Sequence, residues 1–145
     1  MNLESLTKQL IQIESISPND AGCFDILESA LEGMNFSCER ISYKNVENLY
    51  AVIGSQGPTL CFLGHTDVVP TGPSDQWTYP PFSGETHDDH IYGRGAADMK
   101  GNICAFVEAL GSFLKTEKLN YRIAILLTSN EEGTPEDGFI DELLK

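Results

Sequence analysis

The stretch Thr59-Leu60-Cys61-Phe62-Leu63-Gly64-His65-Thr66-Asp67 decides the fold of this chain. Its first five residues form a continuous apolar run between Pro58 and Gly64, which is typical of a β-strand covered on both faces of a sheet. His65 and Asp67 follow directly, at the carboxyl end of the expected strand, where α/β sheets build their sites. We therefore expect an α/β protein whose functional residues begin at His65.

The segments around this run support the same fold class. A second fully buried strand is predicted over Arg122–Thr128, and a buried helix from Gly101 to about Leu114 separates it from the first strand. The remaining expected elements are helices over Leu3–Ile13 and Cys23–Met34, strands over Phe36–Tyr43 and Leu49–Ile53, a short strand at Ile91-Tyr92 and the start of a helix at Gly138–Lys145. This order predicts an α/β domain with a mixed β-sheet flanked by helices.

Composition limits the classes of partner. The 145 residues suffice for one domain, and 41% hydrophobic with 21% charged residues is ordinary for a globular protein. The net charge of −13 argues against binding to nucleic acids or anionic membranes. No apolar run approaches the length of a membrane span, and the N-terminus lacks the features of a secretory signal.

Four cysteines, Cys23, Cys38, Cys61 and Cys104, occur without a CxxC pair. Cys61 and Cys104 lie inside apolar stretches. We interpret the cysteines as free, buried thiols of a protein in the reducing cytoplasm.

A long irregular segment follows the first buried strand, from His65 to about Gly84. Loops of this length inside a compact domain are usually functional or disordered. The aromatic residues Trp77, Tyr79 and Phe82 argue against disorder, and we expect them to pin the loop to the domain.

His65 and Asp67 form the first of three clusters that could carry chemistry. Both side chains point the same way if the strand geometry continues through the triplet. A carboxylate next to a metal-binding imidazole can fix the tautomer and orientation of the ring. A hydrogen-bonded turn without a ligand is the alternative interpretation.

The second cluster is Tyr92-Gly93-Arg94-Gly95-Ala96-Ala97-Asp98-Met99-Lys100-Gly101. Its small residues permit a close approach of the backbone and unusual dihedral angles. Asp98 precedes the helix expected from Gly101, so it is either the N-cap of that helix or a carboxylate that bridges two cations.

The third cluster, Thr128-Ser129-Asn130-Glu131-Glu132-Gly133, follows the second buried strand. Adjacent residues of an extended chain point to opposite sides, so Glu131 and Glu132 can have different roles. One would face a metal ion and the other a reacting water molecule. A solvated acidic turn is the alternative.

Together the three clusters indicate a metal-assisted hydrolase, because each supplies ligands suited to zinc where an element or turn ends. His87 and His90 are weaker candidates that fit a surface hairpin better. Arg94 and Lys100 are expected to have capping or ion-pair roles.

The clusters resemble the zinc peptidase/deacylase family M20 in their order and spacing. The matching blocks are Gly64-His65-Thr66-Asp67-Val68-Val69-Pro70, Trp77, Pro80-Pro81-Phe82, Tyr92 to Gly101, and Thr128 to Gly133. Val68-Val69-Pro70 and Glu136-Asp137-Gly138 point to the members that remove succinate from N-succinyl-LL-2,6-diaminopimelate, a step of lysine and diaminopimelate biosynthesis. Asn130 departs from the aspartate that the family often has there.

The resemblance implies a site with two zinc ions, or cobalt in their place. His65 matches a ligand of one ion, Asp98 the carboxylate that bridges both, and Glu132 a ligand of the second. Asp67 matches the catalytic residue that orients His65, and Glu131 matches the general base. The peptide bond after the bridging aspartate, here Asp98-Met99, is expected to be cis.

Family members are considerably longer than this chain. The resemblance therefore implies that residues 1–145 are part of a zinc-exopeptidase-like catalytic domain, without the dimerisation domain, the C-terminal catalytic part, a further acidic ligand and a late histidine. We expect this chain alone not to hydrolyse the substrate at a useful rate. An intact member is expected to be a cytoplasmic homodimer that acts on a small-molecule N-succinyl amino acid.

Two other functions remain open. Residues that select the substrate would lie outside these 145, so a sister N-acyl-amino-acid hydrolase such as acetylornithine deacetylase is one alternative. The other is a non-catalytic fragment that acts by weak metal binding or by self-association through an exposed sheet edge.

Overall fold

The computed structural model describes residues 2–134, so the helix start expected at Gly138–Lys145 and the Glu136-Asp137-Gly138 motif lie outside the described residues. The elements along the chain are α1 (Leu3–Ile11), α2 (Cys23–Glu32), β1 (Ser37–Tyr43), β2 (Val46–Ile53), β3 (Thr59–His65), η1 (Ser74–Gln76), β4 (Thr86–His87), β5 (His90–Ile91), η2 (Ala96–Lys100), α3 (Gly101–Thr116) and β6 (Arg122–Thr128). The predicted α/β class is confirmed. The first two helices end two residues earlier than predicted, and α3 ends two residues later.

The main sheet has four strands in the order β1-β2-β6-β3. β6 pairs antiparallel with β2 and parallel with β3, which confirms the mixed sheet. Helix α3 belongs to the connection between the two parallel strands, as parallel pairing requires. The parallel register places His65 opposite Thr128, so the two carboxyl ends meet at one edge of the sheet.

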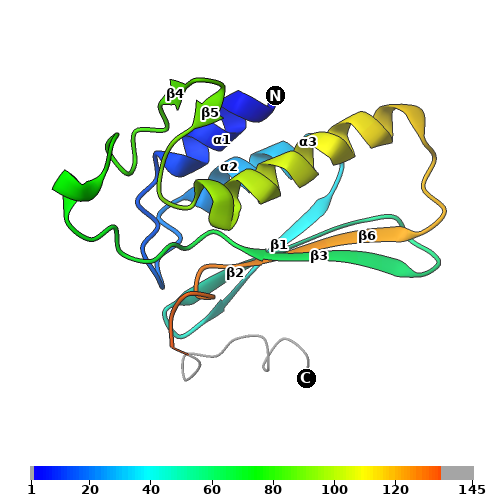
Figure 1. The fold of residues 1–145 in the computed structure, drawn as a ribbon. Helices are drawn as coiled ribbons and strands as arrows, with labels where there is room; N and C mark the ends of the chain where they lie inside the picture. Colours follow the sequence, from blue (N-terminus) through cyan, green and yellow to red (C-terminus); the bar gives the residue numbers. More distant parts are fainter. Residues whose placement is uncertain (1, 135–145) are drawn as a thin grey trace.

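The core lies between the sheet and the three α-helices, which cover the same face of the sheet (Figure 1). Apolar residues of every helix enter it, including the completely buried Leu10, Phe24 and Ile103, which meet Leu49 and Leu127 from the strands. Burying side chains of this kind stabilises a fold by about 1.5–3 kcal/mol each. This one-sided core holds the carboxyl ends of β3 and β6 in place.

The expectation that β3 is covered on both faces is wrong for the described residues. β3 is one of the two edge strands of the sheet. No helix of the described part lies on the face of the sheet that points away from α1, α2 and α3. Leu63, on the uncovered face, is consequently 54% exposed, and Leu60, near the start of this edge strand, is 55% exposed. β6 lies between β2 and β3 and is closer to the prediction of full burial, although Arg122 is exposed and Leu126 is half-buried.

All four cysteines are free, as expected, but they are not all buried. Cys23 and Cys104 lie in the core, Cys38 is half-buried, and Cys61 is exposed on β3. Cys61 is exposed for the same reason as Leu63, two residues further along that strand.

The segment that follows β3 is long and irregular, as predicted, apart from the single turn η1. The indole N–H of Trp77 donates to the Thr71 carbonyl over 2.9 Å, and the ring of Tyr79 stacks on His87 with 3.8 Å between centroids. His87 and His90 belong to the predicted surface hairpin, formed by β4 and β5. No helix among residues 2–134 is both long and apolar enough to cross a membrane.

Candidate metal centre

The site is built where the parallel strands β3 and β6 end. Beyond the ladder, the amide of Thr66 donates to the Thr128 carbonyl over 3.0 Å, so the two chains leave the sheet together. Segment 65–67 therefore lies beside the loop that carries Glu131 and Glu132. This edge is where parallel sheets generally place ligands.

Asp98 reaches the same place from the segment before α3. Within η2, Asp98 and Met99 leave helical geometry, with φ of −131° and −135°. The Asp98-Met99 peptide bond is cis, as the family resemblance implied. Met99 lies against Gly64, where a Cβ atom would come within 3.1 Å of the methionine methyl group. Asp98 Oδ1 is thereby held 3.2 Å from His65 Nε2.

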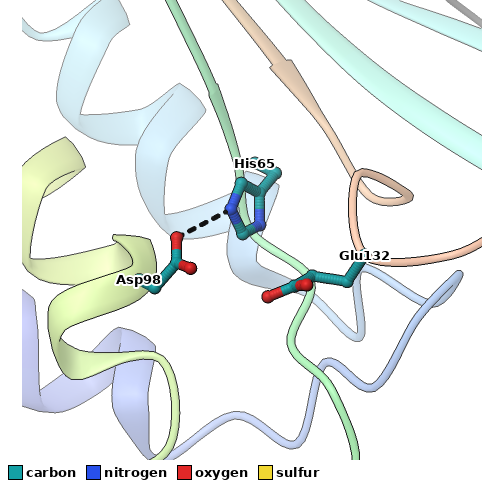
Figure 2. Close-up of side chains that lie close together, drawn as sticks. All are labelled: His65, Asp98 and Glu132. Carbon is teal, nitrogen blue, oxygen red and sulfur yellow. Dashed lines mark hydrogen bonds and ion pairs between the residues drawn. The ribbon is translucent and has the colours of Figure 1, made fainter.

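The alternative interpretation of Asp98 as a helix N-cap is wrong. The N-cap of α3 is Lys100, and no side chain caps that helix end. The Asp98 side chain is 77% exposed, and its carboxylate faces the imidazole of His65 (Figure 2).

Asp67 is completely buried and joins the two loops of the site. Its carboxylate accepts hydrogen bonds from the amides of Glu131 and Glu132, each over 3.1 Å, and from the Ser17 hydroxyl. Burial by itself raises the pKa of Asp67, but its bonds to His65, Ser17 and the two amides lower the pKa below the usual value. Asp67 is thus a fixed anion that sets where both glutamates leave the backbone.

His65 is buried, with its two ring nitrogens in different surroundings. Nδ1 lies 2.9 Å from the Asp67 carbonyl oxygen and 3.5 Å from the Asp67 carboxylate. Nε2 faces Asp98, with Glu131 Oε2 at 3.8 Å. Burial lowers the pKa of His65, but its contacts with Asp67 and Asp98 outweigh burial and raise the pKa to about 9. The fixed Nδ1 side leaves Nε2 as the nitrogen that could bind a metal ion.

His65, Asp98 and Glu132 fit a zinc-type ion. Their ligand atoms, an imidazole nitrogen and two carboxylate oxygens, all lie within 4.8 Å of one another. Two ligands of a tetrahedral zinc ion are separated by roughly 3.4 Å, so small rotations of the two carboxylates would fit the group around one ion, or around a pair of ions that share the two oxygens of Asp98. Figure 2 shows the carboxylates on either side of the imidazole, one from η2 and one from the loop after β6.

Glu131 and Glu132 are brought to the same place but differ in surroundings. Glu131 is 58% exposed and does not belong to the three-residue group. Glu132 is half-buried, and burial raises its pKa above the usual value. The charge of His65 opposes this rise in pKa, whereas the charges of Asp98, Glu131 and Asp67 add to it. Five residues singled out in the sequence thus converge, while their individual roles stay predictions.

Two residues that support the site, Ser17 and Asp20, were not predicted from the sequence. Ser17 lies 50 positions before Asp67, which its hydroxyl contacts, and no local pattern marks it. Asp20 is buried and accepts from the Thr66 hydroxyl over 3.0 Å and from the Phe24 amide of α2 over 3.0 Å. An aspartate close to a helix start was a detectable signal, although Asp20 lies two residues before Gly22, the N-cap of α2.

Replacing Asp20 by alanine is expected to lower the free energy of unfolding by about 2 kcal/mol. The change removes the acceptor for the start of α2 and leaves the buried Thr66 hydroxyl without its partner. Asp20→Asn retains an acceptor and is expected to lose less, since burial raises the pKa of Asp20 and disfavours its charge. Urea unfolding of both variants tests this, and equal losses would contradict it.

Comparison with known proteins agrees with this geometry. The sequence profile of the peptidase family M20/M25/M40 matches residues 61–144. A Delftia acidovorans protein named succinyl-diaminopimelate desuccinylase is 50% identical over an alignment of 151 positions, which covers 97% of this chain and 39% of that protein. The chain spans about a third of the length of the curated relatives that it matches.

Two solved structures show the same fold. The crystal structure of human carnosine dipeptidase 1 is 24% identical and has a TM-score of 0.87, covering 98% of this chain and 34% of that one. An M20 family metallo-carboxypeptidase from Sulfolobus solfataricus is 27% identical with a TM-score of 0.78, covering 88% and 30%. The region that matches the family profile, residues 61–144, contains His65, Asp67, Asp98, Glu131 and Glu132. This chain belongs to the peptidase family M20/M25/M40.

Proposed function

We propose that this chain supplies part of the active site of a metal-dependent amide hydrolase that removes succinate from N-succinyl-LL-2,6-diaminopimelate. The observation that carries the proposal is the convergence of His65, Asp98 and Glu132, with Glu131 beside them. Desuccinylase relatives at 46–50% identity over nearly the whole chain support the reaction and the substrate class.

In this proposal His65 and Glu132 would each hold one metal ion, and Asp98 would be shared between the two. When bound, zinc or cobalt supplies a Lewis acid that polarises the amide carbonyl and makes a water molecule more acidic. The Sulfolobus solfataricus relative, an M20 family metallo-carboxypeptidase, supports metal dependence.

The residues around the ions would perform the proton transfers. Glu131 accepts a proton from the attacking water and delivers it to the nitrogen of the leaving amine, so the products are succinate and diaminopimelate. Asp67 holds His65 through Nδ1 and positions the Glu131 amide, which keeps the base next to the metal ligands.

Further parts of the proposal concern the whole protein. The relatives' greater length supports a partial catalytic domain that is completed by other residues, and we propose a homodimer for the complete enzyme. The four free thiols and the bacterial desuccinylase relatives support a location in the cytoplasm.

A chimeric enzyme tests the proposal. The segment of the Delftia acidovorans desuccinylase that matches this chain is replaced by the chain itself, and hydrolysis is measured with zinc or cobalt present. Hydrolysis of N-succinyl-LL-2,6-diaminopimelate that a chelator abolishes is expected. The chimera tests the metal-dependent chemistry of this chain, because the Delftia part supplies the residues that select the substrate. A folded chimera that binds no metal, or binds metal without hydrolysing this substrate, would overturn the proposal.

A further inference from the structure

Lys100 is a buried charge that the proposed reaction does not use. Its side chain is completely buried, and Nζ donates to the carbonyls of Leu10 and Ile13, each over 2.8 Å. These carbonyls lie at and just beyond the carboxyl end of α1, where the helix dipole favours a cation, and each also accepts a hydrogen bond from a backbone amide, that of Ile13 and Ser15 respectively. Lys100 therefore ties the segment before α3 to the end of α1.

Burying the ammonium group of Lys100 costs free energy, so packing alone does not explain a lysine at this position. Transferring an ammonium group into a protein interior costs several kcal/mol even when it is paired. An apolar side chain of similar length would fill the same space without this cost.

The segment that Lys100 anchors is the one that carries Asp98. Helical geometry is interrupted at Asp98 and Met99, so helical hydrogen bonds do not by themselves fix the carboxylate. The Lys100 amide donates to Gly95 across this interruption over 2.9 Å. Gly95 has a φ of +79°, and a Cβ atom there would lie 2.6 Å from a Val68 methyl group, so this end of the segment is fixed too.

We propose that Lys100 is a positioning residue for the metal-binding carboxylate of Asp98. Its Nζ holds the interrupted turn on the carboxyl end of α1, and the turn presents Asp98 Oδ1 to His65 Nε2. The inference rests on the proposed metal-dependent function, and it adds a residue two positions beyond the ligand that acts through backbone placement.

Cobalt titration of the 145-residue chain tests this inference, with visible absorption spectra recording the ligand field. Lys100→Met removes the charge and both donors but keeps the length of the side chain. It is expected to weaken cobalt binding by about 10–100-fold, the range found when groups that orient metal ligands are removed, and to change the spectrum. Lys8→Met is the matched control, because Lys8 is a half-buried lysine of α1 that pairs with the exposed Glu4.

A double-variant cycle separates positioning from general stability. If Lys100 acts through Asp98, Lys100→Met changes cobalt affinity less than twofold once Asp98→Ala is present. An equal loss in both backgrounds, or parental affinity and spectrum in Lys100→Met, would overturn the inference. Lys100→Gln, which retains one donor group, replaces the methionine variant if circular dichroism shows that Lys100→Met is unfolded. If the parent chain alone binds no cobalt, the same variants are titrated in the chimeric enzyme, and absence of cobalt binding by the parent chimera would count against the proposed metal-dependent function.

Discussion

Replacing Glu131 by glutamine is expected to lower turnover of the chimeric enzyme by about 10²–10⁴-fold while metal affinity stays within a few-fold of the parent. Glutamine keeps the shape of the side chain but cannot accept the proton of the attacking water. Metal binding is expected to survive because Glu131 lies outside the group formed by His65, Asp98 and Glu132.

The neighbouring residue provides the matched control. Glu132→Gln removes a charge from the metal-binding group and is expected to weaken zinc affinity at least tenfold, with activity restored in part by excess zinc. Steady-state kinetics combined with zinc titration separate the two effects. If Glu131→Gln lost as much zinc affinity as Glu132→Gln, the division of roles between the adjacent glutamates would be wrong.

Much of this site could be predicted because its chemistry follows sequence patterns that are local. Apolar runs predict β3 and β6, and the residues after each run must lie at one edge of the sheet if the two strands are parallel. His65 and Glu132 are therefore expected to lie close together from the sequence pattern. Asp98 does not follow from the strands, because its local pattern favours a helix cap equally well; the family resemblance assigns it to the site.

The burial of β3 and the support of Asp67 could not be predicted in the same way. An apolar run shows that other elements can cover a strand on both faces. Leu60 and Leu63 are nevertheless exposed, because β3 is one of the two edge strands of the described sheet and one of its faces is uncovered. Ser17 and Asp20 reach the site through contacts that span 50 and 46 residues. Such contacts depend on how α2 meets the strand ends, which residue spacing within a segment does not determine.

Lys100 illustrates a further limit. The sequence predicted capping or an ion pair for Lys100. In the structure its side chain caps the carboxyl end of α1, although the residue itself is the N-cap of α3. The acceptors lie 90 and 87 residues earlier in the chain. A capping role can be anticipated from residue type, whereas its target depends on the packing of α1 against α3.

The metal-free chain is expected to lose stability between about pH 6.5 and pH 9 because of His65. The pKa of His65 is raised from 6.5 to about 9 in the folded protein, so the protonated ring stabilises the fold fully below pH 6.5 and this contribution disappears as the pH rises through about 9. At ~1.4 kcal/mol for each pKa unit, the contribution is about 3 kcal/mol. Urea unfolding of the parent chain against His65→Gln measures it, since the variant lacks this titration.

Zinc is expected to reverse the sign of this pH dependence. A metal ion and a proton compete for Nε2 of His65, so zinc binding requires the neutral ring and becomes tighter as the pH rises. Stabilisation by a fixed zinc concentration should therefore grow from pH 6 to pH 8 in the parent chain and be nearly absent in His65→Gln. Zinc stabilisation that is independent of pH, or equal in the variant, would show that the ion binds elsewhere. The group around His65 behaves as a metal site if the chain loses stability with rising pH in the absence of zinc and gains stability with rising pH in its presence. A buried ion pair without a metal function would show only the first effect.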